Sequence, residues 1–89
     1  MKAQMYNFSS WVSETDTDKL KTKYEKLLND SWFWVIWLTE KYFEPFWYTW
    51  LYLLSESHFA IHTFPEEWQS YIELTSCIEW PFNNFLKNI

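Results

Sequence analysis

The stretch Leu54–Glu66 reads Leu-Ser-Glu-Ser-His-Phe-Ala-Ile-His-Thr-Phe-Pro-Glu and is the most informative part of the chain. It places a hydroxyl side chain, Ser57, within five residues of both histidines of the protein, His58 and His62. The only cysteine, Cys77, follows Ser57 by twenty residues. In a chain of 89 residues, such a concentration of reactive side chains is the first candidate for a functional site.

The segments around this stretch predict a small α+β domain. Thr17–Asn29 follows several N-cap residues and carries apolar residues at helical spacing, so it predicts a helix. Strands are predicted at Gln4–Phe8, Ser31–Thr39, Phe46–Ser55 and Ile72–Cys77, a polar turn at Glu40–Pro45, and a second helix at Phe82–Lys87, which Pro81 opens. The order β-α-β-β-β-α favours a single domain over residues 1–89. It is expected to be a two-layer sandwich, an antiparallel sheet with helices on one face.

Composition limits the compartment and the partners that can be expected for the protein. Apolar residues make up 48% of the chain and aromatic residues 25%, more than so small a core can enclose, which favours a second copy of the chain as partner. A single cysteine fits a reducing compartment, and Met1–Ser10 lacks the features of a signal peptide, so a cytoplasmic protein is expected. The longest uncharged apolar-rich run, Phe46–Leu54, is far too short to span a membrane.

Charge and glycine content exclude further classes. The net charge is −5 with no basic stripe, so nucleic acid is not an expected partner. The chain has no glycine, which rules out glycine-rich phosphate-binding loops. Turns that need a positive φ are therefore expected at Asn29-Asp30 and Asn83-Asn84. No metal site is expected.

Two segments carry a specific resemblance. Glu56–Glu66 reads Glu-Ser-His-Phe-Ala-Ile-His-Thr-Phe-Pro-Glu, and Ile72–Ile78 reads Ile-Glu-Leu-Thr-Ser-Cys-Ile. They resemble the pyruvoyl-dependent S-adenosylmethionine decarboxylases of the bacterial and archaeal type, whose signature runs approximately E-S-H-x-x-I-H-T-W-P-E, followed by a strand that ends T-C-G. Upstream, Phe43-Glu44-Pro45 and Thr49 fall where that family has an F-x-P turn and a hydroxyl residue.

The resemblance implies a proenzyme that cleaves itself. In that family the serine hydroxyl, here Ser57, attacks the preceding carbonyl, here that of Glu56, and forms an ester. Elimination then cuts the chain between the two residues and leaves a pyruvoyl group in place of the serine. This cofactor forms a Schiff base with the amine of an amino-acid-type substrate and withdraws electrons from the bond to the carboxylate. The pathway implied is polyamine (spermidine) synthesis.

The same resemblance assigns roles to the remaining residues. His62 assists self-processing, with the Thr49 hydroxyl helping to hold the oxyanion. Cys77 is the acid that reprotonates carbon after CO2 leaves, because a thiol pKa can be tuned toward neutrality. The substrate pocket is assigned three residues: Phe43, Phe64 and Glu66. The expected assembly is a homodimer whose aromatic sheets meet with the helices outside.

Departures from the family pattern leave the substrate open. Trp47, Trp50 and Ile78 are bulky residues in places where the family commonly has glycine, and Phe64 stands in place of its tryptophan. Bulky replacements around a pocket change which substrate fits. Arginine or ornithine is the alternative to S-adenosylmethionine. A second class is a divergent homologue that no longer cleaves and serves as a binding or regulatory subunit.

Overall fold

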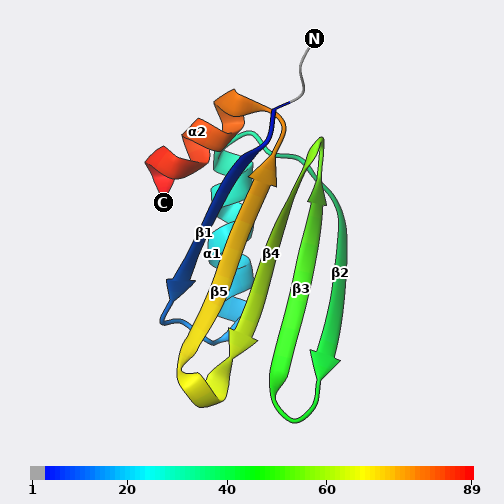
Figure 1. The fold of residues 1–89 in the computed structure, drawn as a ribbon, viewed down its shortest axis with the longest axis vertical. Helices are drawn as coiled ribbons and strands as arrows, with labels where there is room; N and C mark the ends of the chain where they lie inside the picture. Colours follow the sequence, from blue (N-terminus) through cyan, green and yellow to red (C-terminus); the bar gives the residue numbers. More distant parts are fainter. Residues whose placement is uncertain (1–3) are drawn as a thin grey trace.

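A computed structural model describes residues 4–89, which form a five-stranded antiparallel sheet with two helices on one face (Figure 1). The strands lie in the order β1-β5-β4-β3-β2. In chain order the elements are β1 (Tyr6–Val12), α1 (Thr17–Asp30), β2 (Val35–Phe43), β3 (Trp47–Leu54), β4 (Ser57–Phe64), a 3-10 turn η1 (Pro65–Glu67), β5 (Gln69–Ser76) and α2 (Glu79–Asn88). The predicted two-layer α+β sandwich is confirmed.

Helix α1 forms where the sequence predicts it and extends one residue further. The Asp16 carboxylate caps its first turn by accepting the backbone N–H of Lys19 at 3.0 Å. Its buried face consists of Leu20, Tyr24, Leu27 and Leu28. The helix ends at Asp30 and is capped by Ser31, whose hydroxyl donates to the Leu27 carbonyl at 2.7 Å.

The core lies between this helix layer and one face of the sheet. Alternate residues of the central strands are fully buried there, among them Trp50, Phe59, Ile61, Ile72 and Leu74. The other face, which we call the open face, is not covered by any helix in the described part of the chain (Figure 1). Every residue of β2, at the edge of the sheet, is exposed.

One strand was missed in the sequence-based prediction. Ser57–Phe64 is β4, a central strand that pairs with both β3 and β5, so the element order is β-α-β-β-β-β-α. Its side chains alternate between a buried set, which includes Phe59 and Ile61, and a set on the open face, which includes His62. The reactive residues Ser57, His58 and His62 all lie within this strand, on both of its faces.

The predicted boundaries of other elements need correction. Residues 40–43 belong to β2, so the predicted turn at Glu40–Pro45 is confined to residues 44–46. Cross-strand pairing overrides the polar character of Glu40 and Lys41, which lie opposite Trp50 and Thr49. The predicted strand Ser31–Thr39 is displaced by four residues at both ends, because Ser31 caps α1 and residues 32–34 lie outside any strand. The remaining strands and the second helix also differ from their predicted ranges at their ends.

The prediction for positive φ angles was wrong. Asn29-Asp30 and Asn83-Asn84 lie inside α1 and α2, where the backbone is helical. The described residues with positive φ are Trp32 (73°), Glu56 (62°) and Trp68 (58°). Without glycine, this conformation falls on residues with a Cβ, at a cost of about 1–2 kcal/mol each.

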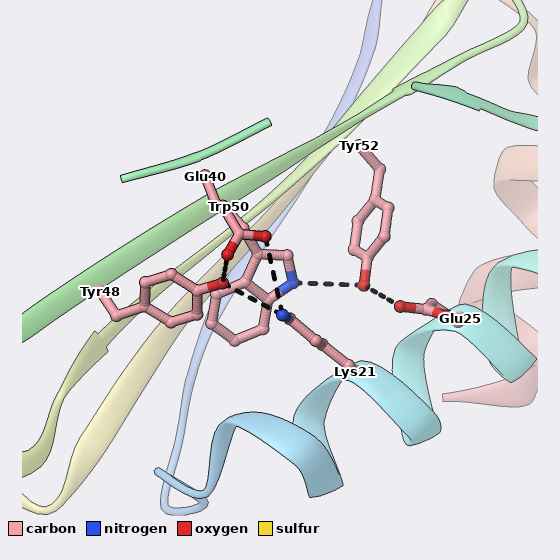
Figure 2. A network of polar contacts seen from close by, with 6 residues as sticks. All are labelled: Lys21, Glu25, Glu40, Tyr48, Trp50 and Tyr52. Atoms are coloured by element: carbon pink, nitrogen blue, oxygen red, sulfur yellow. Dashed lines mark hydrogen bonds and ion pairs between the residues drawn. The ribbon is translucent and has the colours of Figure 1, made fainter. Parts of the chain in front are cut away.

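Two polar chains tie α1 to the sheet (Figure 2). Lys21 donates to the Tyr48 hydroxyl at 3.1 Å, and that hydroxyl donates to Glu40 at 2.6 Å. The Lys21 ammonium also lies 3.9 Å from the Glu40 carboxylate. The hydrogen bond to Tyr48 raises the pKa of Lys21. This chain joins α1 to β3 through Tyr48 and to the edge strand β2 through Glu40.

The second chain runs through Tyr52, which is almost fully buried. Its hydroxyl accepts from Trp50 Nε1 at 3.2 Å and donates to Glu25 at 2.6 Å. Burial, and then the hydrogen bond to the Glu25 carboxylate, raise the pKa of Tyr52 well above 10.0. Both features favour the neutral phenol in the folded state.

This pKa shift predicts a loss of stability at alkaline pH. A raised pKa in the folded state contributes stability that is fully present below the unfolded pKa of 10.0 and is lost as pH rises toward the folded value. The free energy of unfolding, measured by urea denaturation from pH 8 to 11, should therefore fall above about pH 10. Tyr52→Phe should lower stability at pH 8 by roughly 1–3 kcal/mol but flatten the alkaline decline. Tyr71→Phe, on the open face, controls for loss of one tyrosine; an unchanged slope in Tyr52→Phe would refute the assignment.

No helix in residues 4–89 has the length and apolar character needed to cross a membrane.

Candidate active site

The Glu56–Ser57 peptide bond lies in a tight turn between β3 and β4. Leu54 pairs with Ser57 in the ladder, so Ser55 and Glu56 form a two-residue turn. Glu56 holds a φ of 62° without being glycine. The turn is at the upper end of the sheet in Figure 1. The residue before Ser57 therefore carries backbone strain.

The carbonyl oxygen of Glu56 is held by the neighbouring strand end. It accepts the backbone N–H of Cys77 at 3.3 Å and the Cys77 thiol at 2.8 Å. Cys77 is exposed, directly after β5. Two donors from one residue thus bind the oxygen that would carry negative charge if the Glu56 carbonyl were attacked.

The Ser57 side chain lies on the helix side of the sheet. It is 8% exposed, and its hydroxyl donates to Ser76 Oγ at 2.8 Å. Glu56, Ser57, Ser76 and Cys77 form what we call the upper cluster. Sequence analysis selected all of them except Ser76, whose role depends on strand pairing between β4 and β5.

His62 and Thr49 meet on the open face. They lie opposite each other in the β3–β4 ladder, and Thr49 Oγ1 is 3.0 Å from His62 Nδ1. The Tyr71 ring lies 6.3 Å from the imidazole, between ring centres. The histidine and the hydroxyl that the resemblance assigns to self-processing thus lie side by side, and their roles in processing stay a prediction. His58, on the same strand, is half-buried, and the sequence analysis assigned it no role.

The predicted pocket residues lie at the end of the sheet where β2 turns into β3 and β4 into η1, which is the lower end in Figure 1. Phe43 lies opposite Trp47 in the β2–β3 ladder. Trp47 joins the other two residues, because its ring packs edge-on against Phe64, with centroids 5.9 Å apart, and its Nε1 donates to the Glu66 carboxylate. Trp47 was noted in the sequence only as a departure from the family, yet it connects the pocket. Together these residues form the lower cluster: Phe43, Trp47, Thr49, His62, Phe64 and Glu66.

One chain does not bring the two clusters together. Ser57 and His62 are five residues apart on one extended strand, which is roughly 16 Å at about 3.3 Å per residue. Their side chains also lie on opposite faces, Ser57 with the buried set and His62 with the open one. Within residues 4–89 no three histidine, cysteine or acidic side chains gather as a metal site would require.

The open face that carries His62 is rich in aromatic side chains. Trp11 packs against Tyr71 at 5.0 Å and against Phe64 at 5.8 Å between ring centroids. Trp37 is 66% exposed, and Trp47 is 41% exposed. Trp11 and Tyr71 were not identified in the sequence, since only the pairing of β1 with β5 places them together.

Comparisons with known proteins identify the family and the fold of the chain. A family model described as S-adenosylmethionine decarboxylase matches residues 5–88. The crystal structure of an adenosylmethionine decarboxylase from Aquifex aeolicus VF5 is similar in fold, with a TM-score of 0.73 and 19% sequence identity. The similarity covers 98% of this chain and 78% of that one. The search of curated protein sequences returned no match.

Proposed function

Because the chain belongs to the S-adenosylmethionine decarboxylase family, we propose that it cuts itself before Ser57 and becomes a pyruvoyl-dependent decarboxylase of S-adenosylmethionine. The observation that carries the proposal is the Glu56 carbonyl, bound by the Cys77 N–H and thiol beside a buried serine hydroxyl. This is the arrangement that attack by Ser57 on its own preceding carbonyl requires.

The first step forms an ester within the upper cluster. Ser57 Oγ bonds to the Glu56 carbonyl carbon, and the bond from that carbon to the Ser57 nitrogen breaks. Negative charge develops on the carbonyl oxygen, where the two Cys77 donors stabilise it. The strained φ at Glu56 favours departure from the starting peptide geometry. All groups needed for this step lie in one chain.

The second step removes the Cα hydrogen of Ser57 and expels the Glu56 carboxylate, which leaves a dehydroalanine at residue 57. Water then hydrolyses the imine tautomer of this residue to the pyruvoyl group, and ammonia leaves. The Ser57 side chain occupies the helix side of the sheet, so a base reaches this hydrogen from the open face. His62 lies on that face but at a distance, with Thr49 fixing its ring through Nδ1. Its own chain cannot deliver it to Ser57.

A homodimer resolves this separation. If two open faces stack with their strands running in opposite directions, the upper cluster of each chain meets the lower cluster of the other. The exposed aromatic residues of that face, including Trp37 and Trp47, would then be buried. His62 and the pocket residues of each copy would thereby complete the site at Ser57 of its partner.

The pyruvoyl group, once formed, supplies the electron-withdrawing carbonyl that makes decarboxylation possible. This chain fits such a group, because Ser57 is the first residue of β4. Once the bond to Glu56 is cut, residue 57 becomes a chain terminus beside the Cys77 thiol. Cys77 is exposed and can donate its proton to a substrate carbon. A reactive thiol that must stay reduced is consistent with a cytoplasmic site of action.

The lower cluster supplies substrate recognition in this proposal. Phe43 and Phe64 offer aromatic faces on which a flat base can stack. Glu66 offers a carboxylate to hydroxyl groups, and Trp47 fixes its position. A purine nucleoside attached to an amino acid matches these groups better than arginine or ornithine, which have no ring to stack.

Release of 14C-labelled CO2 from carboxyl-labelled S-adenosylmethionine, arginine and ornithine tests the substrate. We expect release from S-adenosylmethionine alone, and Phe43→Ala should raise its KM more than it lowers kcat. Release from arginine or ornithine instead would contradict the substrate assignment. No release from any of the three by a cleaved protein would contradict the enzyme assignment.

Cys77→Ala separates the two uses of this residue. The variant keeps the backbone N–H at the Glu56 carbonyl but loses the thiol. Self-cleavage should therefore be slowed by about tenfold or less, which corresponds to one lost hydrogen bond. Turnover of S-adenosylmethionine should fall by roughly 10²-fold or more, because a general acid is removed. Time courses of cleavage and of CO2 release measure both, and equal loss in the two would count against a separate catalytic role.

A further inference from the structure

The hydroxyl of Ser76 is fully buried and fully committed to hydrogen bonds. It accepts from Ser57 Oγ at 2.8 Å and from the Ile78 N–H at 3.0 Å, and it donates to the Ile78 carbonyl at 2.8 Å. A hydroxyl has one hydrogen and two lone pairs, so every hydrogen-bonding position of Ser76 is occupied. It cannot rotate without breaking one of these bonds.

This arrangement dictates which way the Ser57 hydroxyl points. Because the Ser76 hydrogen is used by Ile78, only Ser57 can be the donor between the two serines. The hydrogen of Ser57 is thus directed at Ser76, and the lone pairs of its oxygen face away from Ser76. An attacking oxygen must direct a free lone pair, and not its hydrogen, at the carbonyl carbon.

We propose that Ser76 is a positioning residue for self-cleavage, which holds the Ser57 hydroxyl with a lone pair available to the Glu56 carbonyl carbon. The inference rests on the proposed self-processing and assigns a residue to its first step. Ser76 and Cys77, adjacent in the chain, then hold the two reacting groups from opposite faces of one strand end. Ser76 fixes the nucleophile, and Cys77 fixes the carbonyl oxygen.

Ser76 is not the base of this step. Its own hydrogen is donated to a carbonyl oxygen, which cannot accept a proton at neutral pH. As the bond from Ser57 Oγ to the Glu56 carbonyl carbon forms and the carbon–nitrogen bond breaks, the Ser57 hydroxyl proton passes to the nitrogen, which leaves as an amine. Ser76 keeps its hydrogen throughout and acts through orientation.

Three variants of Ser76 test this role against a merely structural one. Ser76→Thr keeps the hydroxyl. Ser76→Val has nearly the shape of the threonine variant but lacks the hydroxyl, and Ser76→Ala removes the side chain beyond Cβ. Ser70→Ala is the matched control, because Ser70 is also fully buried on the same face of β5 and its hydroxyl donates to the Glu14 carbonyl at 2.7 Å.

The full chain is made in a timed cell-free synthesis, and intact masses are followed after synthesis stops. Ser76→Ala and Ser76→Val should cleave roughly 10–100-fold more slowly than the parent, the size of effect that misorientation of a reacting group causes. Ser76→Thr and Ser70→Ala should cleave within about threefold of the parent rate. Thermal unfolding monitored by circular dichroism is recorded for each variant. If Ser76→Ala does not fold, the cleavage rates of Ser76→Thr and Ser76→Val still show whether the hydroxyl is needed.

Hydroxylamine identifies the step that is affected, since it splits the ester formed by the first step. Slow cleavage without accumulation of the ester supports the inference, because attack itself is then impaired. Accumulated ester in Ser76→Val, or cleavage of folded Ser76→Ala and Ser76→Val at the parent rate, would overturn it while leaving the proposed function intact. Failure of the parent chain to cleave would refute both.

Discussion

Ser57→Ala is expected to remain a single uncleaved chain of about 11.2 kDa under conditions in which the parent protein separates into two fragments. The variant lacks the oxygen that attacks the Glu56 carbonyl, and no other hydroxyl lies in that position. The Ser55 hydroxyl, two residues earlier in the same turn, precedes the Glu56 carbonyl and cannot perform the same shift. Intact mass after incubation for several days measures the result.

The loss should concern chemistry rather than folding. Removal of the Ser57 hydroxyl leaves Ser76 with both of its hydrogen bonds to Ile78, so we expect the free energy of unfolding to change by about 1 kcal/mol. Ser55→Ala is the matched control and should cleave like the parent. Fragments that appear in Ser57→Ala, cut at the same bond, would refute the assignment of the cleavage site.

His62→Ala is expected to stop at the ester and not to separate into fragments. The first step uses the upper cluster of one chain and stays possible, whereas the second step loses its base. Hydroxylamine should therefore cut the His62→Ala protein at position 56, and no pyruvoyl end should form without it. Intact mass before and after hydroxylamine measures both species.

The same variant tests whether the base comes from a second copy. In a mixture of Ser57→Ala and His62→Ala, a mixed dimer contains one complete site, formed by Ser57 of the second variant and His62 of the first. With random pairing of equal amounts of the two variants, about half of the His62→Ala chains should cleave, while no Ser57→Ala chain does. Mixing His62→Ala with the double variant Ser57→Ala/His62→Ala is the control and should restore nothing. Absence of cleavage in a mixture shown to form mixed dimers would contradict the shared site.

The main features of the fold could be predicted from local patterns. In α1, Leu20, Tyr24, Leu27 and Leu28 recur at helical spacing after a capping aspartate, so the sequence determines this helix by itself. In β5, buried residues such as Ile72 alternate with half-buried ones, and the strand was recognised. In β4 the alternation is less regular, because Ala60 is buried between Phe59 and Ile61, and this segment was not assigned to any element.

Pairing between distant segments could not be predicted. The spacing of Ser57 and Cys77 agrees with that of the family. Only the β4–β5 register, however, places Ser57 opposite Ser76 and Cys77 at the Glu56 carbonyl. The resemblance assigned His62 to the processing at Ser57, whereas an extended strand separates the two residues and turns their side chains to opposite faces. The φ of Glu56 was missed for a related reason, since the turn length set by the ladder, rather than residue preference, imposes it.

The central claim is that Ser57 is the precursor of a cofactor, and the intact mass of the parent protein under denaturing conditions tests it most directly. We predict two species, residues 1–56 with a normal carboxyl end and residues 57–89 without a free amine. Their summed mass should equal that of the whole chain plus one water and minus one ammonia. A single species of about 11.2 kDa that persists on incubation would contradict the account, as would two fragments that together gain one water and keep the amine of Ser57.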